Sequence, residues 1–235
     1  MSCKFLAFDI ETAKEVPGDF ADWPKHRPLG ICCAATVAGD TDEVRLWQGG
    51  NDDCRPTARM TAAEAGELVK YLLEMMRQGY TIVTWNGLQF DFDVLAEESQ
   101  LLDECRELAR GHVDMMFHVV CEKGHLLGLE AAAKGMKIPG KTDGMSGMLA
   151  PEMWAGGEFE QVLKYVEQDA RCTLQVAEAC ERKRSLRWIT QRGKSSRMGL
   201  PKGWFTVEQA LKLPLPDTSW MTRPIKRIQF TRWLD

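Results

Sequence analysis

The first strand-like stretch of the chain, residues 5–12, carries two carboxylates one residue apart. Because side chains alternate across a β-strand, Asp9 and Glu11 share one face while Phe8 and Ile10 point to the other. Two adjacent carboxylates repel each other and lose hydration on burial unless a positive charge lies between them. A divalent cation, which prefers oxygen ligands, would supply that charge. The alternative is a strand end in water, where an acidic pair costs little.

A second acidic pair follows a later predicted strand, residues 80–85. Gly87 marks a turn there, and Asp91 and Asp93 lie at the start of a helix that we expect to run to about residue 108. The junction of a strand end and a helix start is a favoured ligand position in open α/β sheets. The alternative is helix capping, for which Asp is a common residue. We interpret Asp114 similarly, as a possible extra ligand but more typically the N-cap of the next helix.

A late helical stretch, residues 159–177, places a phenol and a carboxylate on one face. Tyr165 and Asp169 are four residues apart, and their face borders an apolar stripe. A carboxylate beside a buried stripe costs free energy unless it is paired or bound to metal. The alternative is a solvated helix edge, because Glu167 and Gln168 nearby are residue types that are usually exposed.

The remaining pattern predicts an α/β fold. Residues 29–37 and 43–47 read as strands joined in a hairpin, and 61–79 as a helix that opens with a capping box. Strand, hairpin, helix and strand in this order fit a mixed sheet with helices packed on it. A short helix is expected over 126–136, and the glycine-rich stretch 140–157 reads as a long loop that could border an active site. His112, His118 and His125 lack metal-site spacing and are expected to be packing or surface residues.

Length and composition set limits. The 235 residues suffice for one large α/β domain with an appendage. The sequence contains no apolar run of 18 residues, so we expect no membrane span. The amino terminus lacks the apolar core of a secretory signal, which favours a cytoplasmic protein. Eight cysteines without a CxxC pair argue against a zinc ribbon and indicate reduced, buried thiols.

The charge is unevenly distributed. Residues 182–235 hold 13 Lys and Arg against three Asp and Glu, which leaves 17 basic and 31 acidic residues before them. We therefore expect a domain over 1–181 and a basic extension over 182–235, which contains four of the eight tryptophans and several prolines. Only 206–213 reads as helical. The extension could clamp nucleic acid with cations and aromatic rings, or pack its tryptophans on the acidic domain.

Together, the three acidic motifs are more specific than any one of them. Asp-x-Glu, Asn-x-x-x-Phe-Asp and Tyr-x-x-x-Asp resemble the motifs of the DEDDy 3′–5′ exonucleases, across roughly residues 3–180. The nearest type is the proofreading domain of family-B DNA polymerases and its stand-alone relatives. The histidine-bearing branch of that superfamily would have His at the position of Lys164, whereas Tyr165 fits the tyrosine branch. The resemblance implies a ribonuclease H-like mixed sheet flanked by helices, followed by the basic Trp/Pro-rich arm.

The resemblance also implies roles for single residues. Asp9, Glu11, Asp91 and Asp169 would bind two divalent ions, Mg²⁺ or Mn²⁺, with Asp9 bridging both. Glu11 and Asp169 would complete the first site, and Asp91 would hold the second ion largely through water. Tyr165 would orient the attacking water, since a phenol with an ordinary pKa of about 10 is a poor base.

Three further residues, Thr12, Asn86 and Phe90, are candidate substrate contacts. The resemblance suggests Thr12 at the 3′ end. Asn86 could bond the terminal nucleotide or the backbone of the junction. Phe90 could stack on a base, but aromatic residues at helix starts more often pack in the core.

We therefore expect a metal-dependent 3′–5′ exonuclease acting on the 3′ end of DNA, single-stranded or frayed. An exoribonuclease is the alternative within the same chemistry. A catalytically silent domain that binds nucleic acid or serves as a scaffold is the alternative outside it. The presence of all four carboxylates and the tyrosine argues against a silent domain.

Overall fold

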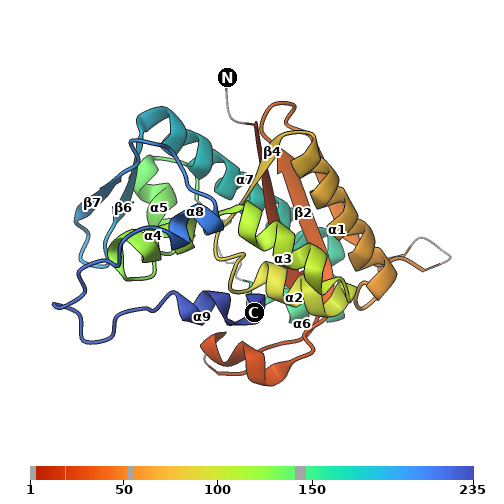
Figure 1. Ribbon diagram of the computed structural model, residues 1–235. Helices are drawn as coiled ribbons and strands as arrows, with labels where there is room; N and C mark the ends of the chain where they lie inside the picture. The colour runs from red at the N-terminus through yellow and green to blue at the C-terminus, as the bar shows by residue number, and fades with distance from the viewer. Residues whose placement is uncertain (1–3, 19, 52–54, 141–146) are drawn as a thin grey trace.

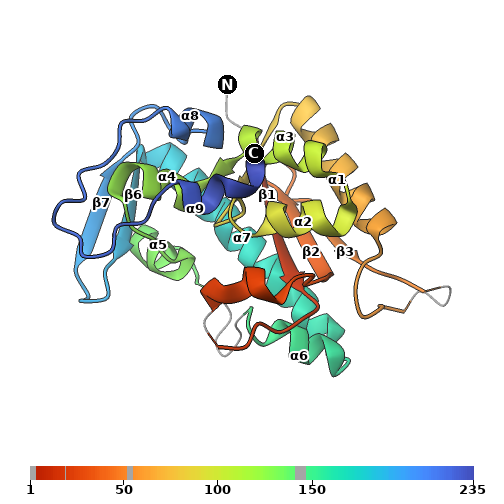
Figure 2. The ribbon, with the colours of Figure 1, turned by 60° about the horizontal axis from the view of Figure 1, so that its bottom comes forward.

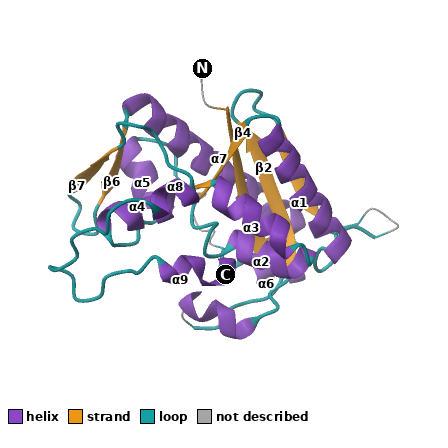
Figure 3. Cartoon of the chain, in the orientation of Figure 1, coloured by secondary structure: helices purple, strands orange, loops and turns teal. Residues whose placement is uncertain are grey.

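The computed structural model describes residues 4–18, 20–51, 55–140 and 147–235. Its centre is a five-stranded sheet in the order β3-β2-β1-β4-β5 (Figure 1, Figure 3). The strands are β1 (Lys4–Thr12), β2 (Ile31–Ala38), β3 (Val44–Gln48), β4 (Tyr80–Thr84) and β5 (Val113–Asp114). Strand β1 pairs antiparallel with β2 and parallel with β4. The predicted mixed sheet is confirmed, and β1 is its middle strand.

Helices cover both faces of the sheet. The helices of this part of the chain are α1 (Ala62–Arg77), α2 (Asp91–Ser99), α3 (Leu102–Gly111), α4 (Met115–Lys123), α5 (Leu129–Met136), α6 (Ala150–Ala155) and α7 (Phe159–Lys183). In Figure 1, α1, α2 and α3 lie in front of the sheet and α7 runs behind it. Leu6 and Phe8 pack in one core cluster with α1 and α2, whereas Phe5 and Ala7 pack in a second cluster with α7. The odd-numbered side chains of β1 therefore face α7.

Local signals fix several helix ends. Thr61 and Glu64 form the predicted capping box of α1. The prediction of one helix from residue 91 to 108 is wrong, because α2 ends at Ser99 and α3 begins at Leu102. Gln100 adopts a left-handed conformation with φ of 60°. The Ser99 hydroxyl donates to the Leu95 carbonyl and accepts the Leu101 N–H, so it stabilises the break.

Two other predicted segments differ in detail. The helix expected over 126–136 begins only at Leu129. The stretch 140–157, predicted as a loop, contains the short helix α6, which has Pro151 in its first turn. Residues 141–146 of that stretch lie outside the described part of the chain. A 3₁₀ helix, η1 (Phe20–His26), lies between β1 and β2.

The carboxyl-terminal segment contains more structure than predicted. Its elements are the antiparallel pair β6 (Ser185–Ile189) and β7 (Ser195–Gly199), then α8 (Val207–Leu211), α9 (Ile228–Thr231) and the 3₁₀ helix η2 (Arg232–Leu234). Helix α5 packs tightly on β6, so that a Cβ atom on Gly135 would lie 2.3 Å from Trp188 Cα. The expected boundary between 181 and 182 falls within the last turn of α7.

Tryptophans attach this segment to the rest of the molecule. Trp204 Nε1 donates to the Ala177 carbonyl at 3.2 Å, and Trp233 Nε1 donates to the Leu88 carbonyl at 2.7 Å.

Within the described ranges, no helix combines the length and apolar character needed to cross a bilayer.

The predicted buried thiols are confirmed for six of the eight cysteines, which are free and buried: Cys32, Cys33, Cys105, Cys121, Cys172 and Cys180. Cys3 and Cys54 lie outside the described residues.

Candidate metal centre

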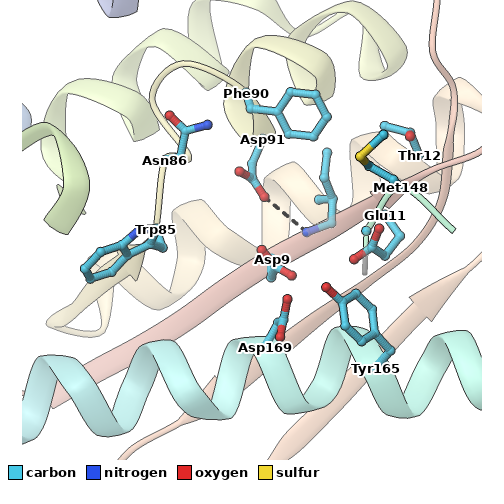
Figure 4. A pocket seen from close by; sticks show the side chains of 12 residues that line it. Asp9, Glu11, Thr12, Trp85, Asn86, Phe90, Asp91, Met148, Tyr165 and Asp169 are labelled. Atoms are coloured by element: carbon cyan, nitrogen blue, oxygen red, sulfur yellow. Dashed lines mark hydrogen bonds between the residues drawn. The ribbon is translucent and has the colours of Figure 1, made fainter. Parts of the chain in front are cut away.

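Three carboxylates converge between the middle strand and the long helix. Asp9 and Glu11 on β1 and Asp169 on α7 each offer an oxygen, and these oxygens all lie within 4.8 Å of one another. Figure 4 shows Asp169 pointing from α7 toward Asp9. Because Asp9 and Glu11 have odd numbers on β1, the alternation that buries Phe5 and Ala7 against α7 also aims both acids at that helix.

The apolar stripe of α7 determines which residues face the strand. Val162, Val166 and Ala170 are fully buried against the sheet. Tyr165 and Asp169 border that stripe and are only 2% and 5% exposed, so they do not lie on a solvated helix edge. The burial of a carboxylate beside two others is unfavourable unless a cation or other partners compensate for it.

Asp91 lies on the opposite side of the same cavity. It begins α2, and its Oδ1 accepts the backbone N–H of Ile10 at 3.1 Å (Figure 4). The N-cap of α2 is Phe90, and no side chain caps this helix, so Asp91 bonds to β1 instead of capping. Burial raises the pKa of Asp91 to about 7, although backbone N–H groups favour its charged form. Asp91 is not part of the three-carboxylate cluster.

Asp93, the other acid of this pair, does not line this cavity but lines a neighbouring one. It forms an ion pair with the guanidinium of Arg27. Burial raises the pKa of Asp93, and Arg27 opposes that rise.

The residues around the cavity fit a hard divalent cation. The cavity has a volume of about 300 Å³. Its lining residues are Asp9, Ile10, Glu11, Thr12, Trp85, Asn86, Phe90, Asp91, Gly147, Met148, Tyr165 and Asp169. Among these described lining residues there is no Lys, Arg or His to balance the carboxylates. A site of carboxylate oxygens without Cys or His suits Mg²⁺ or Mn²⁺ better than zinc.

The three candidate substrate contacts all line this cavity. Thr12 is buried, and its hydroxyl donates to the Lys14 carbonyl at 3.2 Å. Phe90 is half-buried and meets the Trp23 ring edge-on, with 5.1 Å between the centroids. It therefore both packs on the core and borders the cavity.

The backbone of Asn86 is held by the carboxylate of Asp114. It has φ of 77°, a left-handed conformation that Asn tolerates. Its N–H donates to Asp114 Oδ1 at 3.1 Å, and the Leu88 N–H donates to Asp114 Oδ2 at 2.9 Å. The buried Asn86 Oδ1 accepts no hydrogen bond within the described residues. Asp114 also accepts the Phe117 N–H, so the predicted N-cap is confirmed.

The sequence alone did not indicate Trp85, Gly147 or Met148 as lining residues. Gly147 and Met148 belong to the long glycine-rich stretch 140–157, which therefore reaches this cavity through these two residues. A Cβ atom on Gly147 would lie 3.4 Å from Glu11 Oε2. Trp85 follows β4 directly, and its Nε1 donates to the Leu127 carbonyl at 2.9 Å.

Two of the histidines are packing residues, as predicted. His112 Nδ1 lies 2.8 Å from the Ala109 carbonyl, and its Nε2 lies 3.1 Å from Thr84 Oγ1. His118 stacks on Phe205 with a centroid distance of 5.1 Å. Burial lowers the pKa of each of these histidines to about 4.

Comparisons with known proteins agree with this fold. A solved family B DNA polymerase from the hyperthermophilic archaeon Pyrobaculum calidifontis matches with a TM-score of 0.52 and 20% sequence identity. The match covers 77% of this chain but only 25% of the polymerase chain, and at this identity it shows the fold alone. No curated protein sequence matches the chain. A family model described as RNase H superfamily matches residues 49–180, more than half of the sequence. The chain therefore belongs to the RNase H superfamily.

Proposed function

We propose that this protein is a metal-dependent 3′–5′ exonuclease that hydrolyses phosphodiester bonds at the 3′ end of DNA. The observation that carries the proposal is the convergence of Asp9, Glu11 and Asp169 within 4.8 Å. Asp91 and Tyr165 line the same cavity. These five residues belong to the motifs that resemble the DEDDy exonucleases, and the superfamily supports a nuclease.

The carboxylates would hold two cations. Asp9 would contribute to both sites, Glu11 and Asp169 to the first, and Asp91 to the second through water. Two bound divalent ions generate a nucleophile from water at neutral pH and stabilise the leaving oxygen of the displacement. The four carboxylates nearly neutralise two dications, which allows an anionic phosphate to approach.

The other residues bind and orient. The Tyr165 hydroxyl would hold the attacking water by a hydrogen bond and remain protonated. Thr12 would contact the 3′ end of the strand. Asn86, whose Oδ1 has no partner among the described residues, would accept a hydrogen bond from the terminal nucleotide. Phe90 would support the terminal base, with Trp23 behind it.

The six buried, free thiols suit the reducing cytoplasm, where we place the protein.

A nuclease assay that compares DNA with RNA tests the proposal, because neither the acidic cluster nor its cavity distinguishes the two substrates. Single-stranded DNA and RNA labelled at the 5′ or the 3′ end are incubated with Mg²⁺, Mn²⁺ or EDTA. We expect mononucleotides from the 3′ end of DNA with either metal and no reaction with EDTA.

Two controls make this experiment decisive. Asp9→Ala should abolish the release of mononucleotides, whereas cleavage of a closed single-stranded circle would show an endonuclease and contradict the proposal. A chain that binds DNA but releases no nucleotide under any metal condition would be the silent domain instead.

A further inference from the structure

A second, larger cavity adjoins the acidic one. It has a volume of about 830 Å³ and is bordered by η1, the start of α2, the loop between α4 and α5, and the α9–η2 segment. We call it the arm groove. Figures 1 and 2 show α9 and the segment of η1 facing each other across this region. Asn86 lines both cavities, and Trp23 of the groove packs against Phe90 of the acidic cavity. The two cavities are therefore neighbours.

The groove offers rigid aromatic surface. Trp233 lines it and is half-buried, and its Nε1 is fixed to the Leu88 carbonyl at 2.7 Å. Phe230 lies behind this surface and packs on Phe117 with a centroid distance of 5.4 Å. An indole anchored through its polar edge keeps its face available to a flat, apolar partner.

The groove also carries positive charge at its rim. Arg232 is exposed and lines the groove. Arg27 lines it too, but its guanidinium is paired with Asp93 and with Glu97, the latter at 3.1 Å. Arg232 is therefore the better placed of the two to meet an external anion.

The wall that carries Trp233 and Arg232 is held in place from below. Arg106 donates to the Trp233 carbonyl at 3.3 Å, and Arg110 donates to the Leu234 carbonyl at 2.7 Å. At the other end of α9, Arg227 donates to the carbonyls of Cys121, Leu213 and Pro214 at 2.7–3.1 Å. The groove is thus formed before any ligand arrives, which reduces the cost of binding.

We propose that the arm groove binds the nucleotides that precede the terminal one, as a single strand. Trp233 stacks on a base and Arg232 contacts a phosphate. Aromatic faces combined with cations are the general means by which proteins bind unpaired strands. A volume of about 830 Å³ falls within the range of about 300–1,000 Å³ that is typical of ligand-binding pockets. This inference rests on the proposed exonuclease function and adds that the substrate has several unpaired nucleotides at its 3′ end.

The test measures binding without cleavage. Fluorescein-labelled oligothymidylates of two and eight nucleotides are titrated with the full-length Asp9→Ala protein, and anisotropy is followed. When Trp233→Ala is introduced into the Asp9→Ala protein, the affinity for the octamer should fall about five- to 150-fold, the range for loss of one stacked base. The loss should be smaller for the dimer, which does not extend far beyond the acidic cavity.

Two further variants make the result independent of folding. Trp233→Phe keeps a stacking ring and should weaken octamer binding less than Trp233→Ala does. Arg232→Ala, at an exposed position, should lower the slope of log affinity against log salt by about 0.7, as expected for one lost phosphate contact to a single strand. Arg192→Ala, an exposed arginine in the turn between β6 and β7, is the matched control and should leave binding unchanged.

The outcomes separate the two proposals. If Trp233→Ala and Arg232→Ala bind the octamer as tightly as the parent, the groove proposal is overturned, even if the wild-type protein degrades DNA from the 3′ end. If the octamer binding depends on Trp233 but the wild-type protein releases no mononucleotides, the groove stands and the exonuclease function fails.

Discussion

The carboxylate of Asp91 accepts the backbone N–H of Ile10 at 3.1 Å, between the two acids of β1. The start of α2 is therefore bonded to the strand at the residue that separates Asp9 from Glu11. Asp91 thus has two separable properties: a charge that the proposed second metal would use, and a hydrogen bond that fixes the strand.

Asn and Ala at position 91 should separate these two properties. Asp91→Asn keeps an oxygen acceptor for Ile10, so we expect little loss of stability but a 10- to 100-fold loss of metal affinity. Asp91→Ala leaves the buried Ile10 N–H unsatisfied and should cost about 1–3 kcal/mol in free energy of unfolding. Urea denaturation and Mn²⁺ titration measure the two effects. Equal stability of both variants would contradict the structural role of this bond.

The pH dependence of stability should also report on Asp91. Burial raises its pKa in the folded protein to about 7, from 3.8 in the unfolded chain. The folded state then binds more protons between these values, so the contribution of Asp91 to stability is present below pH 4 and is lost as the pH rises toward 7.

Other buried groups titrate in the same window, namely Asp114, His112 and His118, so a difference between proteins is required. In EDTA, the free energy of unfolding of the wild type minus that of Asp91→Asn should fall as the pH rises from 4 to 7. A flat difference would show that Asp91 is ionised throughout this range.

Tyr165 should affect the reaction rather than metal binding. Tyr165→Phe removes the hydroxyl and keeps the buried ring, which is only 2% exposed. We expect mononucleotide release to slow by about 100-fold, within the range for a positioned group in proton-transfer chemistry. Mn²⁺ affinity should stay within a factor of two or so, because the proposed ligands remain. Unchanged cleavage would show that the hydroxyl does not hold the attacking water.

Asp114 should stabilise the loop that carries Asn86. Its buried carboxylate accepts the N–H groups of Asn86, Leu88 and Phe117. Asp114→Asn replaces one of the two acceptor oxygens with a donor and should lower the free energy of unfolding by about 1–3 kcal/mol. Asp217→Asn is the control, since Asp217 is exposed and accepts a local hydrogen bond from the Ser219 N–H. Equal denaturation midpoints for both variants would argue against this role.

Gly135 should tolerate no side chain. A Cβ atom there would lie 2.3 Å from Trp188 Cα and 2.4 Å from the Arg187 carbonyl oxygen, both backbone atoms of β6. Gly135→Ala should therefore separate α5 from β6 and cost about 1–3 kcal/mol or more in thermal or urea denaturation. Gly128→Ala, which meets no atom within 4 Å, is the matched control. Equal melting temperatures for the two variants would show that α5 does not pack closely on β6 in solution.

Much of the fold follows from short-range patterns. Alternation in β1 correctly places Asp9 and Glu11 on one face, and the apolar stripe of α7 places Tyr165 and Asp169 beside it. These predictions succeed because strand and helix periods are local properties of the sequence.

Other features do not follow from the periodicity of strands and helices. The break at Gln100 lies in a helix-compatible sequence and follows from the hydrogen bonds of Ser99. Whether Asp91 caps its helix or bonds to β1 cannot be decided without the position of Ile10. The β6–β7 pair lies in a strongly basic stretch where apolar alternation is weak. The arm groove requires Trp233 to meet Leu88, which is 145 residues away.

The alternation of side chains along β1 limits which mutations this site can accept during evolution. The even-numbered residues of the strand build the core with α1 and α2, and the odd-numbered ones build both the second core and the acidic cluster. Inserting or deleting one residue before Asp9 would turn both carboxylates into an apolar core and Phe8 toward the cluster. Substitutions of the carboxylates can therefore remove the metal site while the fold persists, but a one-residue shift in the register of this strand would disrupt the site and the core together.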